Sequence, residues 1–229
     1  MTEIDWMPIG LSMQLAALTT AILFILGLPL SYMLAYSRFR GRAFLEALVS
    51  LPLVLPPTVI GFYLLLFFSP SRALGSWLRE SLGMQLIFSF EGLIVASVLY
   101  SLPFMVQPLQ SGFRSVPKAQ REAALLMGKS RVSTLFFVLL PQMRVSLLTG
   151  AVLTFAHTLG EFGVVLMIGG NLPGETRVAS IALYDRVEAM DYGAAHTYAL
   201  VLLTLTFVIL LSVYSLNASP EAPQRRLRP

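Results

Sequence analysis

Two ionisable residues lie inside a long apolar stretch of the chain, His157 and Glu161 in the sequence AHTLGEFG. On a helix, a spacing of four positions places both side chains on one face. Ionisable groups among apolar residues are costly to keep and usually serve a function. The pair predicts a gate or the wall of a polar pathway. A carboxylate that only bonds a neighbouring backbone amide is an equal alternative.

The common patterns of catalytic and metal-binding residues are absent. The tripeptide GKS at 128–130 lacks the upstream glycine of a nucleotide-binding loop and follows a helical pattern rather than a strand. There is no Gly-x-Ser-x-Gly or His-Glu-x-x-His motif, His196 stands alone, and the chain has no cysteine. We therefore expect no catalytic residue, no metal site, no cofactor and no ATP hydrolysis in this chain.

The composition points to lipid as the solvent. Of the 229 residues, 56% are hydrophobic and 12% are charged, about half the charged fraction of a soluble domain. In a bilayer each backbone amide must bond within its own segment, so each long apolar run is expected to be a helix. An all-α integral membrane protein with five transmembrane helices follows, at about 9–37, 45–68, 92–110, 145–169 and 198–216.

Prolines interrupt the second of these stretches. Pro52, Pro56 and Pro57 each remove an amide donor and prevent a straight helix there. An interrupted helix inside the bilayer is stable only where it lies against other protein segments or a water-filled cavity. A kink made for helix packing is the alternative to a ligand pathway.

The basic residues predict the orientation. Twelve of the sixteen Lys and Arg residues lie between the first and second stretches, between the third and fourth, or after the fifth. Because Lys and Arg collect on the cytoplasmic side, the N-terminus is expected outside and the C-terminus in the cytoplasm. We expect one transmembrane domain at 9–217, a cytoplasmic loop at 112–143 and a cytoplasmic tail at 218–229.

That loop contains a helix-favouring segment with a soluble character, KAQREAALLMG, which ends at Gly128. A short exposed helix on a cytoplasmic loop suits insertion into another protein. Its composition alone fits a helix lying on lipid equally well.

The spacing of residues in this loop resembles the EAA loop of type I ABC importer permeases. The resemblance rests on Glu122, Ala123, Ala124, Gly128, Leu140 and Pro141. In that family the loop carries a coupling helix that docks on a cytoplasmic ATPase. The resemblance implies the type I importer transmembrane fold and assigns these six residues to ATPase coupling.

Further segments resemble bacterial molybdate permeases, namely LPLVLPPTVIGFYLLL, FSFEGLIVASVLYSLPFMVQPL and LGEFGVVLMIGGNLPGETR. The resemblance implies the permease of a molybdate importer, with tungstate as a second substrate, in the bacterial inner membrane. It implies a homodimer in lipid, two ATPase subunits that hold the ATP and Mg, an external oxyanion-binding protein, and no nucleic acid.

A tetrahedral dianion prefers amide and hydroxyl donors to carboxylates. Thr58, Thr154 and Thr158 are therefore candidate pathway hydroxyls beside the His157 and Glu161 pair. A sulfate or thiosulfate permease with the same machinery and a stand-alone secondary carrier remain the alternatives.

Overall fold

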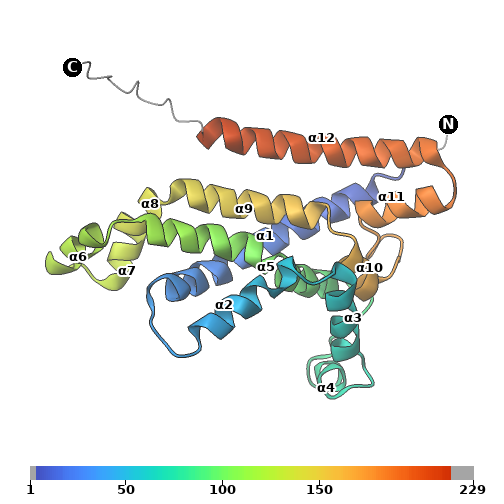
Figure 1. The fold of residues 1–229 in the computed structure, drawn as a ribbon. Coiled ribbons are helices and arrows are strands. Elements are labelled where there is room, and N and C mark those ends of the chain that lie inside the picture. Colours follow the sequence, from blue (N-terminus) through green and yellow to red (C-terminus); the bar gives the residue numbers. More distant parts are fainter. Residues whose placement is uncertain (1–3, 218–229) are drawn as a thin grey trace.

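The computed structural model describes residues 4–217, and every regular element in that range is a helix (Figure 1). The long helices are α1 (Met7–Tyr36), α5 (Phe90–Ser115), α9 (Arg144–Leu159) and α12 (Tyr192–Asn217). The short elements are α2 (Arg42–Ser50), the 3-10 turn η1 (Leu51–Leu53), α3 (Pro57–Phe68), α4 (Ala73–Leu82), α6 (Lys118–Leu126), α7 (Arg131–Thr134), the π-helical η2 (Leu135–Leu139), α8 (Leu140–Gln142), α10 (Gly163–Gly169) and α11 (Ala179–Glu188). The predicted tail at 218–229 lies outside the described residues.

The long helices form a bundle with two different ends. Helix α1 packs along α5, α9 lies against both, and α12 lies against α9 and α11. The start of α1 lies with α11 at one end, whereas α6, α7 and α8 project from the other (Figure 1). We name these the α11 end and the α6 end. Leu15, Leu93 and Ile168 belong to the buried core toward the α11 end, and Leu109 and Phe113 to the core toward the α6 end.

Three described helices are long and apolar enough to cross a membrane: α1, α5 and Tyr192–Ser215 of α12. The number rises to five if two bent pairs of segments each count as one span. Arg42–Leu53 and Pro57–Phe68 meet at 110°, and Arg131–Gln142 and Arg144–Leu159 meet at 78°. The all-helical membrane architecture agrees with the sequence.

Two of the predicted stretches are not continuous helices. The stretch at 45–68 breaks at 54–56, where the consecutive prolines Pro56 and Pro57 remove amide donors. The expectation that prolines prevent a straight helix there is confirmed. The interpretation of 145–169 as one helix is wrong, because α9 ends at Leu159 and α10 begins at Gly163.

Close approach and hydroxyl bonds hold α1 against α5. Gly27 faces Met105, and a Cβ at Gly27 would lie 2.9 Å from the Met105 Cγ. Farther along, the Ser31 hydroxyl donates to the Val106 carbonyl at 3.1 Å, and the Tyr36 hydroxyl donates to the Phe113 carbonyl at 2.5 Å. In an apolar solvent, small residues and interhelical hydrogen bonds are the contacts that favour helix association.

A larger side chain at Gly27 should therefore separate these helices. We expect Gly27→Leu to cost about 1–3 kcal/mol of stability by overpacking and to lower the thermal unfolding midpoint of the purified protein in detergent. Gly10→Leu is the matched control, because Gly10 lies in the same helix with no atom within 4 Å of its added Cβ. Equal unfolding midpoints for the two variants would contradict this packing.

Candidate functional site

Helix α6 projects from the bundle with one face buried and the other exposed. Ala124 is buried at 2% exposure, whereas Leu126 and Met127 are 89% and 75% exposed. On the outer face the Lys118 ammonium lies 3.2 Å from the Glu122 carboxylate, one helical turn away. Because both side chains are more than half exposed, this ion pair adds little stability. The helix thus presents two large apolar side chains at its tip, which suits contact with another protein.

Gly128 ends this helix as the sequence predicts. Its φ of +78° is a left-handed conformation that favours glycine. Its N–H donates to the Leu125 carbonyl at 3.0 Å, and the N–H of Lys129 donates to the Ala124 carbonyl at 3.1 Å. The turn satisfies carbonyls at the helix end and directs the chain back toward the bundle.

The return path contains a widened helical turn. The Ser130 hydroxyl accepts the Ser133 N–H at 3.1 Å and caps α7. The π-helical segment η2 follows, and Pro141 is the second residue of α8, the helix after it. Pro141 has no N–H to donate to the carbonyl of Phe137 four residues earlier, so a regular α-helical turn is not available there.

The six predicted coupling residues therefore fall into two groups. Glu122 and Ala123 are exposed on α6, Ala124 faces inward, and Gly128 forms the turn that follows. Leu140 and Pro141 lie in α8, separated from the tip by α7 and η2. The structure describes this arrangement without a partner, so the coupling role of the six residues stays a prediction.

Ser101 of α5 joins His157 and Thr158. The Ser101 Oγ lies 2.9 Å from the Nδ1 of His157 and 2.9 Å from the Oγ1 of Thr158. The imidazole also stacks on the Phe104 ring, with centroids 3.9 Å apart, and is tilted against Tyr100. These contacts fix the imidazole between α5 and α9.

Glu161 is not on the helix face that the spacing suggests, which is a correction. Because α9 ends at Leu159 with Gly160 as its cap, Glu161 lies beyond the helix end. The side chain is 5% exposed, and neither carboxylate oxygen has a hydrogen-bond partner among residues 4–217. Only its backbone carbonyl is bonded across the fold, by the Ser180 hydroxyl at 2.5 Å. The alternative in which the carboxylate bonds a neighbouring amide therefore finds no bond here.

The three candidate threonines occupy different environments. Thr154 is fully buried, and its hydroxyl donates to the Gly150 carbonyl of its own helix at 2.8 Å. Thr158 is 2% exposed and bonded to Ser101. Thr58 is exposed in the first turn of α3. Within one chain the structure does not bring Thr58 into hydrogen bonds with the other two.

The two breaks lie side by side. A Cβ at Gly163, the first residue of α10, would lie 2.8 Å from the Cβ of Pro57 and 3.4 Å from the Thr58 nitrogen. The break at 54–56 and the break at 160–162 are therefore neighbours in space. Irregular backbone within membrane-spanning segments lies against protein or a cavity, not against lipid.

Sequence reasoning missed two further sets of polar contacts. One is the Ser101 bridge, for which the only signal was a serine in the middle of an apolar stretch. The other joins α2 to α5: the Glu46 carboxylate accepts from Gln110 at 2.7 Å, from Arg114 at 2.8 Å and from Arg42 at 3.2 Å. A single Glu in an amphipathic segment gave no sign of these three partners.

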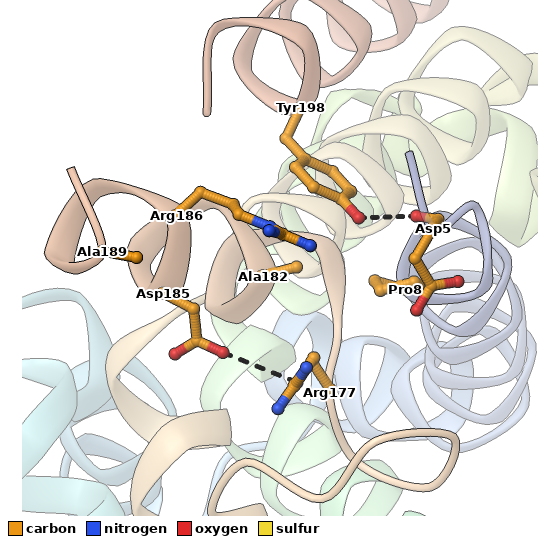
Figure 2. Close-up of a pocket in the computed structure, with 8 residues that line it drawn as sticks. All are labelled: Asp5, Pro8, Arg177, Ala182, Asp185, Arg186, Ala189 and Tyr198. Atoms are coloured by element: carbon orange, nitrogen blue, oxygen red, sulfur yellow. Dashed lines mark hydrogen bonds and ion pairs between the residues drawn. The ribbon is translucent and has the colours of Figure 1, made fainter. Parts of the chain in front are cut away.

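At the α11 end, charged residues surround a cavity of about 260 Å³. Figure 2 shows Arg177 paired with Asp185 and the Tyr198 hydroxyl bonded to the Asp5 carbonyl. These contacts measure 3.5 Å and 2.6 Å, and Arg186 pairs with Asp191 at 3.4 Å. Acids and bases are balanced here, so the contacts join α11, α12 and the N-terminal segment without making a strongly charged site.

Among residues 4–217 no group of three metal-ligating side chains is present. The arrangement offers a projecting contact helix, two adjoining helix breaks and buried hydroxyl bridges. These features suit contact with another protein at the α6 end and polar contacts inside the bundle.

Comparison with known proteins identifies the class. The family model described as "binding-protein-dependent transport system inner membrane component" matches residues 27–220. The chain belongs to this family. It is a multi-pass permease component of an ABC importer in the inner membrane, and it is not itself an ATPase. Membership implies an ATPase and a binding protein as partners, and the permease family binds no cofactor itself.

Individual relatives show which permeases of the family the chain is similar to. The chain is 46% identical over 216 residues to the molybdenum transport system permease protein ModB of Azotobacter vinelandii, covering 94% of this chain and 95% of that one. It is 30% identical to ModB of Escherichia coli, covering 98% and 99% of the two chains. The sulfate transport system permease protein CysT of Escherichia coli is 34% identical and is covered over 70% of its length, with 85% of this chain aligned.

Solved structures share the fold at low identity. A bacterial ABC transporter involved in alginate import matches with a TM-score of 0.75 at 18% identity, covering 92% of this chain and 77% of that one. The MetNI methionine transporter, in an inward-facing conformation, matches with a TM-score of 0.70 at 17% identity, covering 91% and 92%. The family match confirms the resemblance to ABC importer permeases, and these structures show that the fold is shared.

The turn at Gly128 gives a direct test of the projecting helix. Gly128→Val places a β-branched residue at a φ of +78°, which costs about 1–3 kcal/mol of local strain. No atom lies within 4 Å of an added Cβ, so the effect is on the backbone alone. We expect normal membrane insertion, reduced copurification of the ATPase and reduced uptake of the transported substrate.

Gly128→Asn is the matched control, because asparagine tolerates left-handed backbone better than valine does. Copurification and uptake should stay near the wild-type values in this variant. Unchanged uptake by Gly128→Val would show that the shape of this turn does not matter for coupling.

Proposed function

We propose that the chain is the permease subunit of an ATP-driven importer of molybdate, and of tungstate as a chemically similar tetrahedral dianion. The observation that supports molybdate as the substrate is the 46% identity to the molybdenum permease of Azotobacter vinelandii over nearly the whole of both chains. The sulfate permease relative from Escherichia coli is matched over a smaller share of its length, so sulfate or thiosulfate is the second candidate.

Helix α6 is proposed as the coupling element. Leu126 and Met127 are exposed at the tip, where they would enter a groove of the ATPase. Glu122 and Ala123 line the outer face, Ala124 seats the helix on the bundle, and Gly128 forms the turn. Leu140 and Pro141 support the return of the chain to the membrane. Motion of the ATPase would reach the bundle through this loop.

The pathway is proposed to pass the two adjoining breaks. Thr58 is exposed beside Gly163, and its N–H has no backbone acceptor among the described residues, whereas Pro57 has no N–H and the Val59 N–H donates to the Pro56 carbonyl at 3.0 Å. Amide and hydroxyl donors of this kind suit a dianion. His157, Thr154, Thr158 and Glu161 are proposed to act from behind this surface as gate elements, since they are buried or half-buried in the chain. A carboxylate is unsuited to direct contact with the anion.

For the topology we propose five spans within one domain at 9–217, namely α1, the bent pair of α2 with α3, α5, α9 together with α10, and α12. The N-terminus then lies outside, and the loop at 112–143 and the tail at 218–229 lie in the cytoplasm. The basic residues support this orientation. So does the position of the N-terminal segment and of α6 at opposite ends of the bundle (Figure 1).

The working assembly is proposed to be a homodimer with two ATPase subunits and one external oxyanion-binding protein. Five spans are few for a complete pathway, and a two-fold axis would place the break regions of two copies opposite each other. ATP binding would draw the coupling helices together and open the pathway outward, so that the binding protein can release its anion.

Uptake of labelled molybdate by cells that depend on this chain tests the substrate. We expect ATP-dependent uptake that tungstate inhibits at concentrations similar to molybdate and that a hundredfold excess of sulfate leaves largely unchanged. Inhibition by equimolar sulfate would instead favour the sulfate permease. Uptake by the reconstituted chain without an ATPase would establish a stand-alone carrier.

The absence of native cysteine makes the topology easy to test. The proposed topology places two loops outside, at 69–91 and 170–197. A membrane-impermeant maleimide added to intact spheroplasts should label Ser71→Cys and Glu175→Cys, which are exposed positions in these two loops. Lys129→Cys should react only after the membrane is permeabilised. Labelling of Lys129→Cys in sealed spheroplasts would contradict the proposed orientation.

A further inference from the structure

A second cavity lies at the α6 end, between the end of α1 and the inner side of α6 and α7. It has a volume of about 270 Å³. Its polar lining consists of Tyr32, Tyr36, Ser37, Arg121, Arg131 and Thr134. We name it the α1–α6 cavity. The feature that sets it apart from the cavity of Figure 2 is its charge, because its lining contains two arginines and no acid.

The two arginines lack carboxylate partners. Within the described part of the chain neither Arg121 nor Arg131 forms an ion pair, whereas Arg177 and Arg186 of the α11-end cavity both do. The Arg121 guanidinium lies 4.1 Å above the centre of the Tyr36 ring, which holds it in place by a cation–π contact. Two like charges around one small cavity repel each other unless an anion lies between them.

Thr134 supplies an independent sign of a missing partner. It lines the cavity and is 3% exposed, yet its Oγ1 has no hydrogen-bond partner among residues 4–217. A buried hydroxyl without a partner destabilises the fold, so such groups are almost always bonded. The π-helical segment η2 begins at the next residue, and π-helical turns occur frequently at functional sites.

We propose that the α1–α6 cavity binds a tetrahedral oxyanion group of the phosphate type. Guanidinium groups donate paired hydrogen bonds to such oxygens, and tyrosine, serine and threonine hydroxyls complete the donor set. The group is either the headgroup phosphate of an anionic phospholipid or a free oxyanion from the cytoplasm. Both sources present the same oxygens to Arg121, Arg131 and Thr134.

The position of the cavity suits either source. Tyr36 is the last residue of a 30-residue apolar helix, and tyrosines at the ends of spans lie at the level of the lipid headgroups. Basic pockets between helices on the cytoplasmic side are suited to anionic headgroups. The site also lies away from the proposed docking tip: Arg121 is half-buried beside buried Ala124, whereas Leu126 is 89% exposed.

A bound oxyanion would join α1 to the loop that carries α6. Tyr32, Tyr36 and Ser37 belong to the end of α1, whereas Arg121 belongs to α6 and Arg131 and Thr134 to α7. Occupancy would hold the projecting helix against the bundle and so adjust coupling. This consequence rests on the proposed coupling function, but binding itself does not.

The test uses the full-length chain purified together with its ATPase. In the first arm the complex is placed in phosphatidylcholine nanodiscs, and its thermal unfolding is followed while inorganic phosphate replaces chloride at constant ionic strength. In the second arm native mass spectrometry counts the phosphatidylglycerol molecules retained after detergent exchange. Neither measurement requires transport, so failure of the proposed substrate would not affect the result.

Three variants make the test specific to the cavity. Arg131→Gln removes one guanidinium and should weaken binding about tenfold or more. Thr134→Val keeps the side-chain shape, removes the hydroxyl and should weaken binding about fivefold. Arg144→Gln removes an exposed basic residue at the start of α9, outside the cavity, and should bind as the wild type does.

A phosphate-dependent stabilisation that Arg131→Gln and Thr134→Val lose would support the site with a free oxyanion as occupant. Retained phosphatidylglycerol that the same two variants lose would support it with a lipid as occupant. The proposal is overturned if neither arm detects binding. It is equally overturned if Arg144→Gln weakens binding as much as Arg131→Gln, because attraction to surface charge would then explain the result.

Discussion

The contact between α1 and α5 is the constraint on which the rest of the structure depends. A bilayer provides no hydrophobic force to join two apolar helices, so close backbone approach and hydrogen bonds must do so. Gly27 allows the approach, and the hydroxyls of Ser31 and Tyr36 bond carbonyls of α5. The Arg121 guanidinium also stacks on the Tyr36 ring, so the residue that joins α1 to α5 positions the base of α6 as well.

Side-chain contacts connect the α6 end of the bundle to the region where the helices are broken. At the α6 end Glu46 joins α2 to α5 through Gln110 and Arg114, so the segment before the proline break is tied to the long helix that leads into α6. At the break itself Pro57 lies against Gly163. The chain of α5 and its contacts with α2 thus connect the base of α6 to the place where both broken segments meet.

Much of the architecture follows from local rules that a sequence carries. The apolar stretches that become α1, α5 and α12, the proline break before α3 and the turn at Gly128 each depend on residue types within a few positions. The bond from Ser101 to His157 does not, because the two residues lie 56 positions apart and only packing brings them together. Gly160, the cap of α9, is a local signal for the end of that helix, and reading a continuous helix across it placed Glu161 on a face that it does not occupy.

The central claim is that α6 contacts a separate ATPase, and crosslinking from its tip tests that claim most directly. Leu126→Cys would be the only cysteine in the chain, at a position that is 89% exposed in the native structure. Val54→Cys is the control, because Val54 is 83% exposed and lies at the proline break. With a short bismaleimide in native membranes, a covalent adduct with the ATPase is predicted from position 126 and not from position 54. No adduct from position 126, or equal adducts from both positions, would contradict the claim.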